Sequence, residues 1–127
     1  MNQQDVQQWI QYGPEPELVR KAEEFGRQLK QGKLTTSQIR QVFSKLKGIE
    51  AKGFLERRVD FIMLKPLLAY AASRQKTTGL QDLKRTVSWA IDEVVLAQDD
   101  NEALARFKNF CRFFEAVLAY HKAAGGK

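Results

Sequence analysis

The sequence predicts an all-α protein, a compact single-domain bundle of about five helices. Apolar residues recur at intervals of three and four along the chain, which is the spacing of one helix face. β-branched residues do not alternate with polar ones as they do in a half-buried strand. After Pro16 only Pro66 remains to interrupt a helix. At 127 residues the chain has the length of one domain.

The N-terminal end is expected to contribute little to this bundle. Residues 1–13 are rich in glutamine and are expected to be loosely ordered, whereas residues 14–123 are expected to form the helical domain. The first helix begins at Pro14 and Pro16, because proline is tolerated in the first turn, and ends at Gly32, a typical C-terminal residue. Its apolar face consists of Leu18, Ala22, Phe25 and Leu29.

A capping box marks the start of the second helix. Thr35 and Gln38 are three residues apart, so each side chain can bond the backbone amide of the other residue. The helix is predicted to end before Gly53. Its buried face consists of Ile39, Val42, Phe43, Leu46 and Ile49.

The third segment, Phe54 to Gln75, is apolar on nearly every side. A helix of this kind belongs in the middle of a bundle, where all of its faces are covered. Pro66 lacks the amide hydrogen that would bond back to Ile62, and its ring crowds the preceding turn. We therefore expect a kink or break near Lys65.

Two further helices complete the predicted bundle. The fourth spans about Leu80 to Ala97 and packs through Leu83, Val87, Ile91 and Val94. Asp99 and Glu102 are placed to cap the fifth helix, which runs to about Ala123. Residues 124–127 are expected to fray.

The composition indicates a cytoplasmic protein with no membrane partner. No apolar run approaches the ~18 residues of a membrane span. The N-terminus has neither the basic nor the apolar region of a secretory signal. The single cysteine leaves no internal disulfide and is typical of a reducing compartment.

Positive charge is concentrated in one part of the chain. The formal net charge is +6, and residues 27–85 hold 14 Lys and Arg against 4 Asp and Glu. Such a concentration favours a polyanion-binding region. A set of helix faces that are simply rich in lysine is the alternative.

The only cysteine and the only histidine do not form a catalytic pair. Cys111 and His121 are ten residues apart on one predicted helix, which separates them by roughly 15 Å along the axis. A nucleophile and its base need to lie roughly 3 Å apart. We expect Cys111 to be a small core side chain. His121 is expected to pack or to cap the helix end, with a nucleic-acid contact as the alternative.

No other catalytic pattern is present. Asp92 and Glu93 are adjacent, so they point about 100° apart on a helix, and Asp99 and Asp100 lie in a capping loop. Neither pair resembles an acid–base pair or a two-metal site, and no phosphate-binding glycine motif or nucleophile elbow occurs. The sequence therefore predicts no enzyme, no metal and no cofactor.

Cations at helical spacing form the candidate site. On the second helix, residues seven apart make two basic stripes beside the apolar face, and further cations follow after it. The predicted RNA-binding residues are Arg40, Lys45, Lys47, Lys52, Arg57, Arg58, Lys65 and Arg74. Fixed cations can follow a phosphate backbone but carry little sequence information.

Aromatic residues fall on the predicted buried faces, which argues against stacking of bases. The segment TTSQIRQVFSKLK (35–47) could also serve as a recognition helix, so a small helical DNA-binding regulator is the alternative function. A small metal-dependent nuclease is a third, less favoured one.

Four segments together resemble the small subunit of the type III-A CRISPR–Cas (Csm) effector complex. They are EEFGRQL (23–29), LTTSQIRQVF (34–43), LLAYAASR (67–74) and NFCRFFEAVLAYHK (109–122). The resemblance covers about residues 23–122. Ser73 stands where members of the family often have glycine.

The resemblance implies a compact helical protein that is present in more than one copy in a ribonucleoprotein. Small subunits of this kind line the groove that holds crRNA and target RNA and contact the sugar–phosphate backbone, while neighbouring subunits cleave the target. By matched position, Arg40 and Arg74 are the first choices for phosphate contacts. The other six cations rest on the charge pattern alone.

Overall fold

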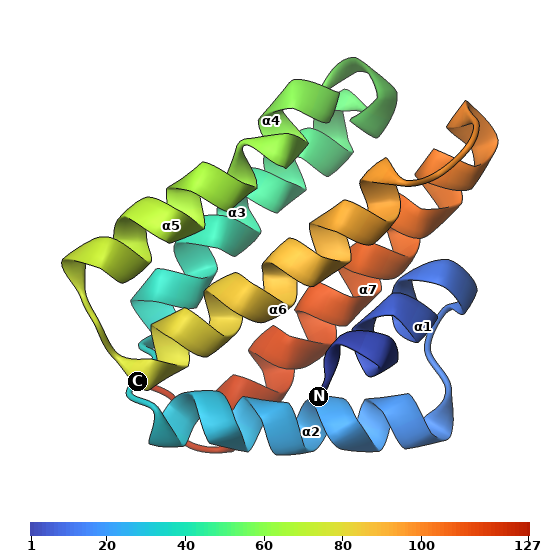
Figure 1. Cartoon of the computed structure of the whole chain (residues 1–127). Helices are drawn as coiled ribbons and strands as arrows, with labels where there is room; N and C mark the ends of the chain where they lie inside the picture. The colour runs from blue at the N-terminus through green and yellow to red at the C-terminus, as the bar shows by residue number, and fades with distance from the viewer.

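The computed structural model describes residues 1–127 and confirms the all-α fold (Figure 1). The elements are α1 (Gln3–Tyr12), α2 (Pro16–Gln31), α3 (Thr36–Lys52), the 3-10 turn η1 (Phe54–Glu56), α4 (Arg58–Ile62), α5 (Leu64–Arg74), α6 (Thr78–Val95) and α7 (Asp100–Ala123). Helices α6 and α7 run side by side through the middle of the molecule. Helices α1 and α2 pack against both of them, α3 packs mainly on α7, and α5 packs mainly on α6.

Helix α1 is an integral part of the bundle, so the expectation of a loosely ordered segment over residues 1–13 is wrong. Asn2 and Asp5 form a capping box that starts the helix. Val6, Trp9 and Ile10 have the spacing of one helix face and are buried against α6 and α7. Three large apolar side chains are enough to dock a ten-residue helix, although most of its other residues are glutamines.

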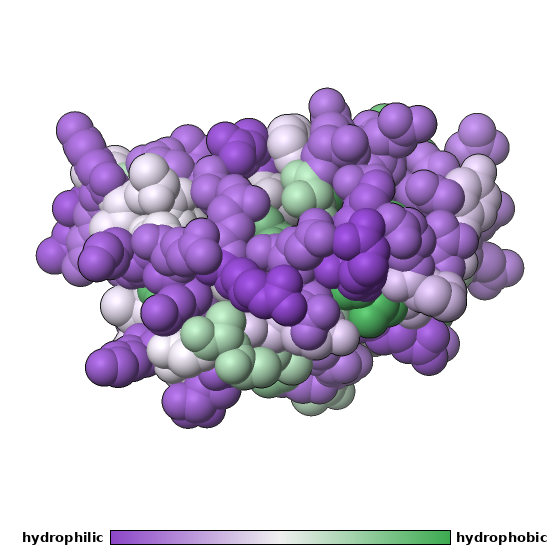
Figure 2. Space-filling view, turned by 90° about the horizontal axis from the view of Figure 1, so that it is seen from below, coloured by the Kyte–Doolittle hydropathy of each residue, from purple (hydrophilic) through white to green (hydrophobic).

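Helix α2 follows the prediction closely and crosses α6 and α7 at an angle (Figure 1). It begins at Pro16 and ends before Gly32, and its predicted apolar face is buried. Gly26 lies directly against α7, because a Cβ atom there would be 2.7 Å from the carbonyl carbon of Tyr120. The outer face of the molecule over α2 carries mainly hydrophilic residues, with small apolar patches among them (Figure 2).

Helix α3 begins at the predicted capping box. The Thr35 hydroxyl accepts from the Gln38 amide at 3.1 Å, and the Gln38 side chain accepts from the Thr35 amide at 3.0 Å. The helix ends before Gly53, whose φ of 100° is strained for any residue with a side chain. Four residues of the predicted apolar face are fully buried, and Phe43 is half-buried.

The segment from Phe54 to Gln75 is neither one helix nor central. It is divided into η1, α4 and α5. The helix is interrupted at Met63, two residues before Lys65. Pro66 therefore lies in the first turn of α5, where its missing amide costs no helical bond. One stripe of the segment faces the core, consisting of Phe54, Phe61, Leu64, Leu68 and Ala72.

Leu67 and Ala71 are half-buried against the core, but many of the other apolar side chains face outward, so the segment forms an outer layer beside α3 (Figure 1). Leu55, Val59, Ile62, Met63 and Tyr70 are all exposed. The prediction of a central helix was wrong because the hydrophobicity of a segment does not determine which of its apolar faces packs against another helix.

The last helix and the residues after it hold the end of the bundle together. The Asp99 side chain accepts from the Glu102 amide at 2.8 Å, as predicted for the start of α7. The Gly126 amide donates to the His121 carbonyl at 3.0 Å, and the Thr36 amide donates to the Lys127 carbonyl at 2.6 Å. Residues 124–127 thus turn back onto the start of α3, and the expectation that they fray is wrong.

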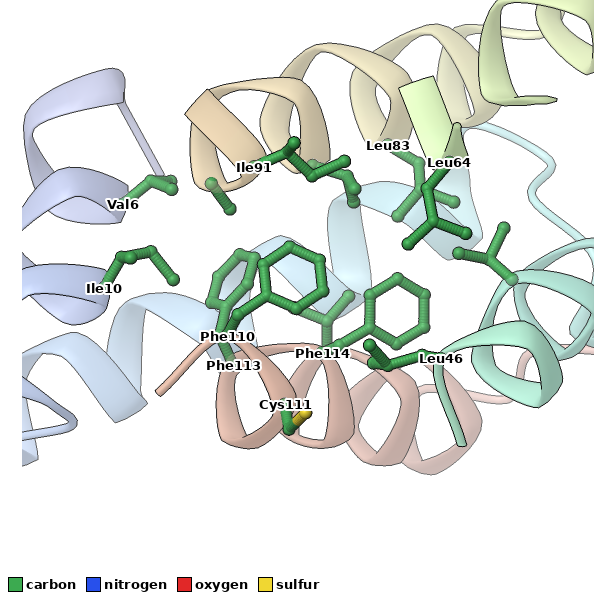
Figure 3. Close-up of a cluster of buried hydrophobic side chains, with 14 of the residues drawn as sticks. Val6, Ile10, Leu46, Leu64, Leu83, Ile91, Phe110, Cys111, Phe113 and Phe114 are labelled. Carbon is green, nitrogen blue, oxygen red and sulfur yellow. The ribbon is translucent and has the colours of Figure 1, made fainter. Parts of the chain in front are cut away.

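Phenylalanines of α7 form the centre of the core. Phe110, Phe113 and Phe114 point from α7 towards α6 and the surrounding helices (Figure 3). The ring centres of Phe110 and Phe114 lie 6.3 Å apart in a stacked arrangement. Those of Phe110 and Phe61 lie 4.9 Å apart in an edge-to-face arrangement. Burial of such rings is a large part of the free energy of folding. It also fixes the positions of α3 and α5, which carry the candidate site.

Candidate nucleic-acid interface

The eight predicted RNA-binding cations all lie on α3 or on the η1–α5 segment beside it (Figure 1). They fall into two groups, according to whether a carboxylate lies within ion-pair distance. The cations without such a partner are Arg40, Lys45, Lys52 and Arg74, and those with one are Lys47, Arg57, Arg58 and Lys65.

An open groove separates α3 from the η1–α5 segment. One hollow of this groove has a volume of about 620 Å³. Its lining residues are Lys45, Gly48, Ile49, Lys52, Arg57, Asp60, Met63, Leu64, Pro66, Leu67 and Tyr70. Lys45 and Lys52 both face it, because residues seven apart lie on the same side of a helix. Asp60 is its single carboxylate and lies 3.9 Å from the Arg57 guanidinium.

A second hollow continues the groove towards the start of α3 and the end of α5. The two hollows share Leu67 and Tyr70. The second contains Arg74 together with hydroxyl and amide side chains of α3 and no carboxylate. The guanidinium carbon of Arg74 lies 5.7 Å from the centre of the Tyr70 ring, within the range of a cation–π contact.

We call the two hollows together the α3–α5 groove. It brings together four of the eight predicted residues, namely Lys45, Lys52, Arg57 and Arg74. Arg40 lies outside it, in a neighbouring depression that shares Ser37 and Gln41 with the second hollow, and also has no carboxylate partner. The two basic stripes of α3 therefore face different parts of the surface.

Acidic residues of α6 and α7 neutralise three of the remaining cations. Lys47 lies 3.0 Å from Glu115, Lys65 lies 2.6 Å from Asp92, and Arg58 pairs with Asp100. Hydrogen bonds that Lys47 donates to Glu115 first, and then to Glu50, raise the pKa of Lys47 above its ordinary value. Exposed ion pairs are weak, so these cations remain available to a polyanion at the cost of breaking a pair.

These pairs could not be seen in the local charge count. The partners are 68, 42 and 27 residues apart in sequence. The excess of positive charge over residues 27–85 is thus reduced in space by the fold itself. Part of the uncompensated charge lies along the α3–α5 groove and at Arg40.

The Cys111 thiol and the His121 imidazole are both buried, away from the candidate site. Cys111 is 5% exposed, and burial first, with Glu50 and Glu115 nearby, raises the pKa of its thiol to about 12. His121 is fully buried, and its Nε2 lies 2.7 Å from the Leu34 carbonyl oxygen. Neither side chain lines the α3–α5 groove.

The acidic pairs noted in the sequence also have partners. Asp92 pairs with Lys65, Asp99 caps α7, and Asp100 pairs with Arg58. Glu93 accepts from Gln11 at 2.8 Å. No group of three or more His, Cys, Asp or Glu side chains is placed to hold a metal ion. Nor does any helix have the length and apolar character needed to cross a membrane.

Tyr70 is the groove residue that the sequence analysis missed. Its side chain is exposed although it belongs to a segment that reads as apolar on all sides. Once α5 is known to bury Leu68 and Ala72, Tyr70 falls on the opposite face, since it is two residues from each. Knowledge of the buried face was the signal that the sequence alone lacked.

Comparison with known proteins gives a consistent result. The family model for Csm2 of type III-A matches residues 14–127. A relative described as "CRISPR system Cms protein Csm2", from Streptococcus thermophilus, is 35% identical over 100 residues. The match covers 74% of this chain and 75% of the relative. No solved structure matches the chain significantly.

Proposed function

The chain belongs to the Csm2 family of type III-A CRISPR systems, and from this premise we propose a more specific role for it. It is a non-catalytic small subunit of the effector complex that binds the sugar–phosphate backbone of crRNA and target RNA without sequence specificity. Its partners are these RNAs, the other subunits of the complex and further copies of itself, and it works in the cytoplasm.

The observation that carries the proposal is the charge of the α3–α5 groove. Lys45, Lys52 and Arg74 line it without any carboxylate within ion-pair distance, and Arg57 meets only Asp60, at 3.9 Å. Unpaired cations along one groove attract a chain of phosphates and release its counterions on binding. Such contacts position a nucleic acid but do not read its sequence.

The non-catalytic role is supported by the state of the two reactive side chains. A thiol with a pKa of about 12 is almost entirely protonated at neutral pH and is a poor nucleophile. The imidazole of His121 is buried and engaged by a backbone carbonyl. The reaction of the complex is therefore assigned to other subunits.

Contacts with other subunits are supported by the exposed apolar side chains. Val59, Ile62 and Met63 lie on the outer layer near the end of the groove, and Val95 and Leu96 lie at the end of α6. Exposed apolar groups that lie close together are typical of protein-contact surfaces. Co-purification of the tagged chain with the other type III-A subunits and a ladder of small RNAs tests this assignment.

RNA binding is tested by fluorescence anisotropy with a short single-stranded RNA at several salt concentrations. Four phosphate contacts predict that the logarithm of the affinity falls with the logarithm of salt with a slope of about −3. Replacement of Lys45 and Lys52 by glutamate should weaken binding ~10-fold or more at low salt and reduce the slope.

The matched control replaces Lys108 and Arg112 of α7 by glutamate. Both are exposed, neither forms an ion pair, and neither lines the groove. The control changes the net charge by the same amount and should lose much less affinity. Equal losses of RNA affinity in the two double variants would mean that Lys45 and Lys52 act only through the net charge of the protein. Strong preference for one duplex DNA sequence in a competition would instead favour the DNA-binding regulator.

A further inference from the structure

We propose that Tyr70 is a stacking platform for an unpaired nucleobase, and that the α3–α5 groove binds single-stranded or locally unpaired RNA around it. The inference rests on the proposed RNA binding and adds a base contact to the backbone contacts. It also reverses the expectation, drawn from the sequence, that no aromatic residue lies among the cations.

The first support is the position of the Tyr70 ring. Its side chain is 62% exposed, and it is one of two residues that line both hollows of the groove. The ring therefore lies where the two hollows meet. The aromatic rings that stabilise the core of this protein are buried. The Tyr70 ring is exposed at the centre of a groove, so it has no evident role in folding.

The second support is the arrangement of charge on either side of the ring. Lys45, Lys52 and Arg57 line the hollow on one side, and Arg74 lines the hollow on the other. Single-strand binding sites combine a basic groove that follows the backbone with an aromatic side chain on which a base stacks. The α3–α5 groove contains both parts.

The guanidinium of Arg74 adds to the platform. Its carbon lies 5.7 Å from the centre of the Tyr70 ring, so one group can hold the ring in place and also contact a phosphate. Arg74 has no carboxylate partner that would compete for it.

The exposed Tyr12 and the half-buried Trp89 lack this combination. Tyr12 is 81% exposed but lies on α1 and lines neither hollow. Trp89 lies beside Arg85, but that guanidinium pairs with Asp82 at 2.8 Å, and Asp92 lines the same depression. Carboxylates there would repel a phosphate.

A nucleotide fits the groove better than an apolar protein segment. The lining combines apolar side chains, such as Leu67 and Leu68, with cations, and a purely apolar partner would leave the three unpaired cations without counter-charges. A nucleotide supplies a flat ring and a phosphate together. Because every base has a flat face, the site is tolerant of sequence.

The test is a cycle of two changes, one in the protein and one in the RNA. The protein change is Tyr70→Leu, which removes the ring and keeps an apolar side chain. The RNA change replaces the bases of a single-stranded oligonucleotide by abasic sugar–phosphate units of the same length. Anisotropy at low salt gives the affinity of each combination. Tyr70→Phe and Tyr12→Leu are the matched controls.

We expect Tyr70→Leu to bind RNA about 5- to 150-fold more weakly than the wild type. The wild type should bind the abasic strand more weakly than RNA by a similar factor. Tyr70→Leu should bind the abasic strand no worse than the wild type does, because the two changes remove the same contact. Tyr70→Phe and Tyr12→Leu should bind RNA like the wild type.

Different failures have different meanings. If the wild type does not bind RNA at low salt, the proposed function and this inference both fail. If RNA binds but Tyr70→Leu has no effect, or its effect persists on the abasic strand, the base-stacking site alone is overturned. If Tyr70→Leu binds RNA normally but no longer assembles with the other subunits, the groove is a protein-docking surface and the inference is wrong.

Discussion

The imidazole Nε2 of His121, in the last turn of α7, lies 2.7 Å from the carbonyl oxygen of Leu34, which precedes α3. Because a carbonyl oxygen only accepts, Nε2 carries the proton in this contact. The ring also lies against Gly126, where a Cβ atom would be 2.2 Å from it. One side chain therefore connects the start of α3, the end of α7 and the turn that follows.

Replacement of His121 by alanine should lower the free energy of unfolding by about 2–4 kcal/mol. The change leaves a cavity at a fully buried site and an unpaired carbonyl at Leu34. Urea denaturation followed by circular dichroism measures the loss. Lys122→Ala, at the exposed next position, is the control and should be nearly neutral. A neutral His121→Ala would mean that this contact does not hold the two helices.

Two glycines in helix interiors should respond in opposite directions to alanine. At Gly26 the added Cβ would lie 2.7 Å from Tyr120 and 2.8 Å from the His121 backbone nitrogen, so α2 and α7 must move apart. We expect a loss of about 1–3 kcal/mol. At Gly48 an added Cβ would meet no atom within 4 Å beyond the neighbouring residues and the backbone of its own helix, so alanine should stabilise α3 by about 0.5–1 kcal/mol. Thermal unfolding of both variants makes the comparison, and equal effects would contradict the close α2–α7 contact.

Truncation of Trp9 tests whether α1 belongs to the bundle. Trp9 is 1% exposed and meets the edge of Phe113 at 5.4 Å. Trp9→Ala should cost about 3–5 kcal/mol. Trp9→Phe should cost less, because the indole nitrogen has no hydrogen-bond partner to lose. If residues 1–13 were loosely ordered, both variants would unfold at the same denaturant concentration as the wild type.

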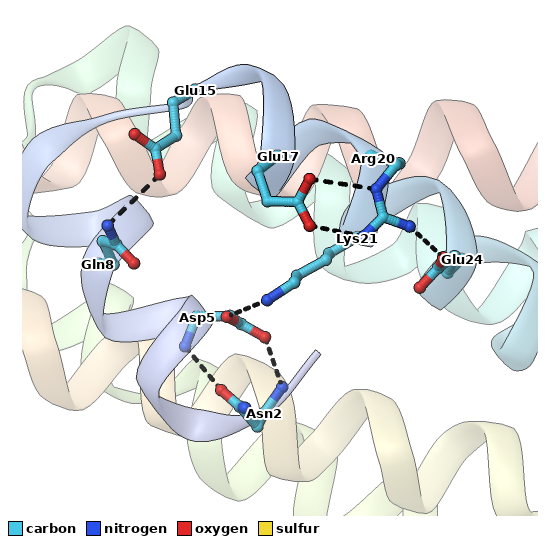
Figure 4. Close-up of polar contacts among 8 residues, drawn as sticks. All are labelled: Asn2, Asp5, Gln8, Glu15, Glu17, Arg20, Lys21 and Glu24. Carbon is cyan, nitrogen blue, oxygen red and sulfur yellow. Dashed lines mark hydrogen bonds and ion pairs between the residues drawn. The ribbon is translucent and has the colours of Figure 1, made fainter.

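The Asp5 carboxylate should make the stability of the protein depend on pH in the acid range. Asp5 accepts from the Asn2 amide at 3.2 Å and from Lys21 Nζ at 2.9 Å (Figure 4). Burial alone would raise the pKa of Asp5, but the bonds from Lys21 and Asn2 outweigh it and hold the pKa below its ordinary value.

A carboxylate with a lowered pKa stabilises the folded state above about pH 4, and this contribution disappears as the pH falls further. Asp5→Asn should therefore be less stable than the wild type at pH 7, and the difference should shrink below about pH 4. Urea denaturation at pH 7, 5 and 3 measures it. A difference that stays constant with pH would contradict the charged contact.

The raised pKa of Cys111 predicts slow alkylation of the native protein. At pH 8 a thiol with a pKa of about 12 holds roughly three orders of magnitude less thiolate than an ordinary cysteine. Iodoacetamide labelling followed by mass spectrometry should be slow in buffer and fast in 6 M urea, about the strength that unfolds a domain of this size. Since ionisation is favoured in the unfolded chain, Cys111 should also reduce stability as the pH rises above about 9. Rapid labelling of the folded protein would place the thiol at the surface.

The features that could be predicted from the sequence are those that local chemistry decides. The capping box at Thr35, the cap at Asp99 and the helix end at Gly32 depend on residues within four positions, so the pattern was sufficient. The spacing of Lys45 and Lys52 likewise placed both side chains in one groove.

The features that were missed depend on residues distant in sequence. Helix α1 has a local start signal in Asn2 and Asp5, but its three apolar residues among glutamines were not weighed as a core face, because they become significant only when α6 and α7 provide a surface for them. The pairing of Lys47 with Glu115 and the exposure of Tyr70 depend on how α3 and α5 dock onto α7 and α6. No local pattern contains that information.

Helices α3 and α5 are each held chiefly by a different central helix, α7 and α6 respectively, and not by one another. The width of the groove is therefore set by the close-packed aromatic layer beneath it, before any ligand arrives. A polyanion that enters meets cations whose backbones are already fixed, and little ordering entropy opposes its binding. Mutations deep in the α6–α7 contact, far from any phosphate, would then alter affinity by changing the distance between the two walls.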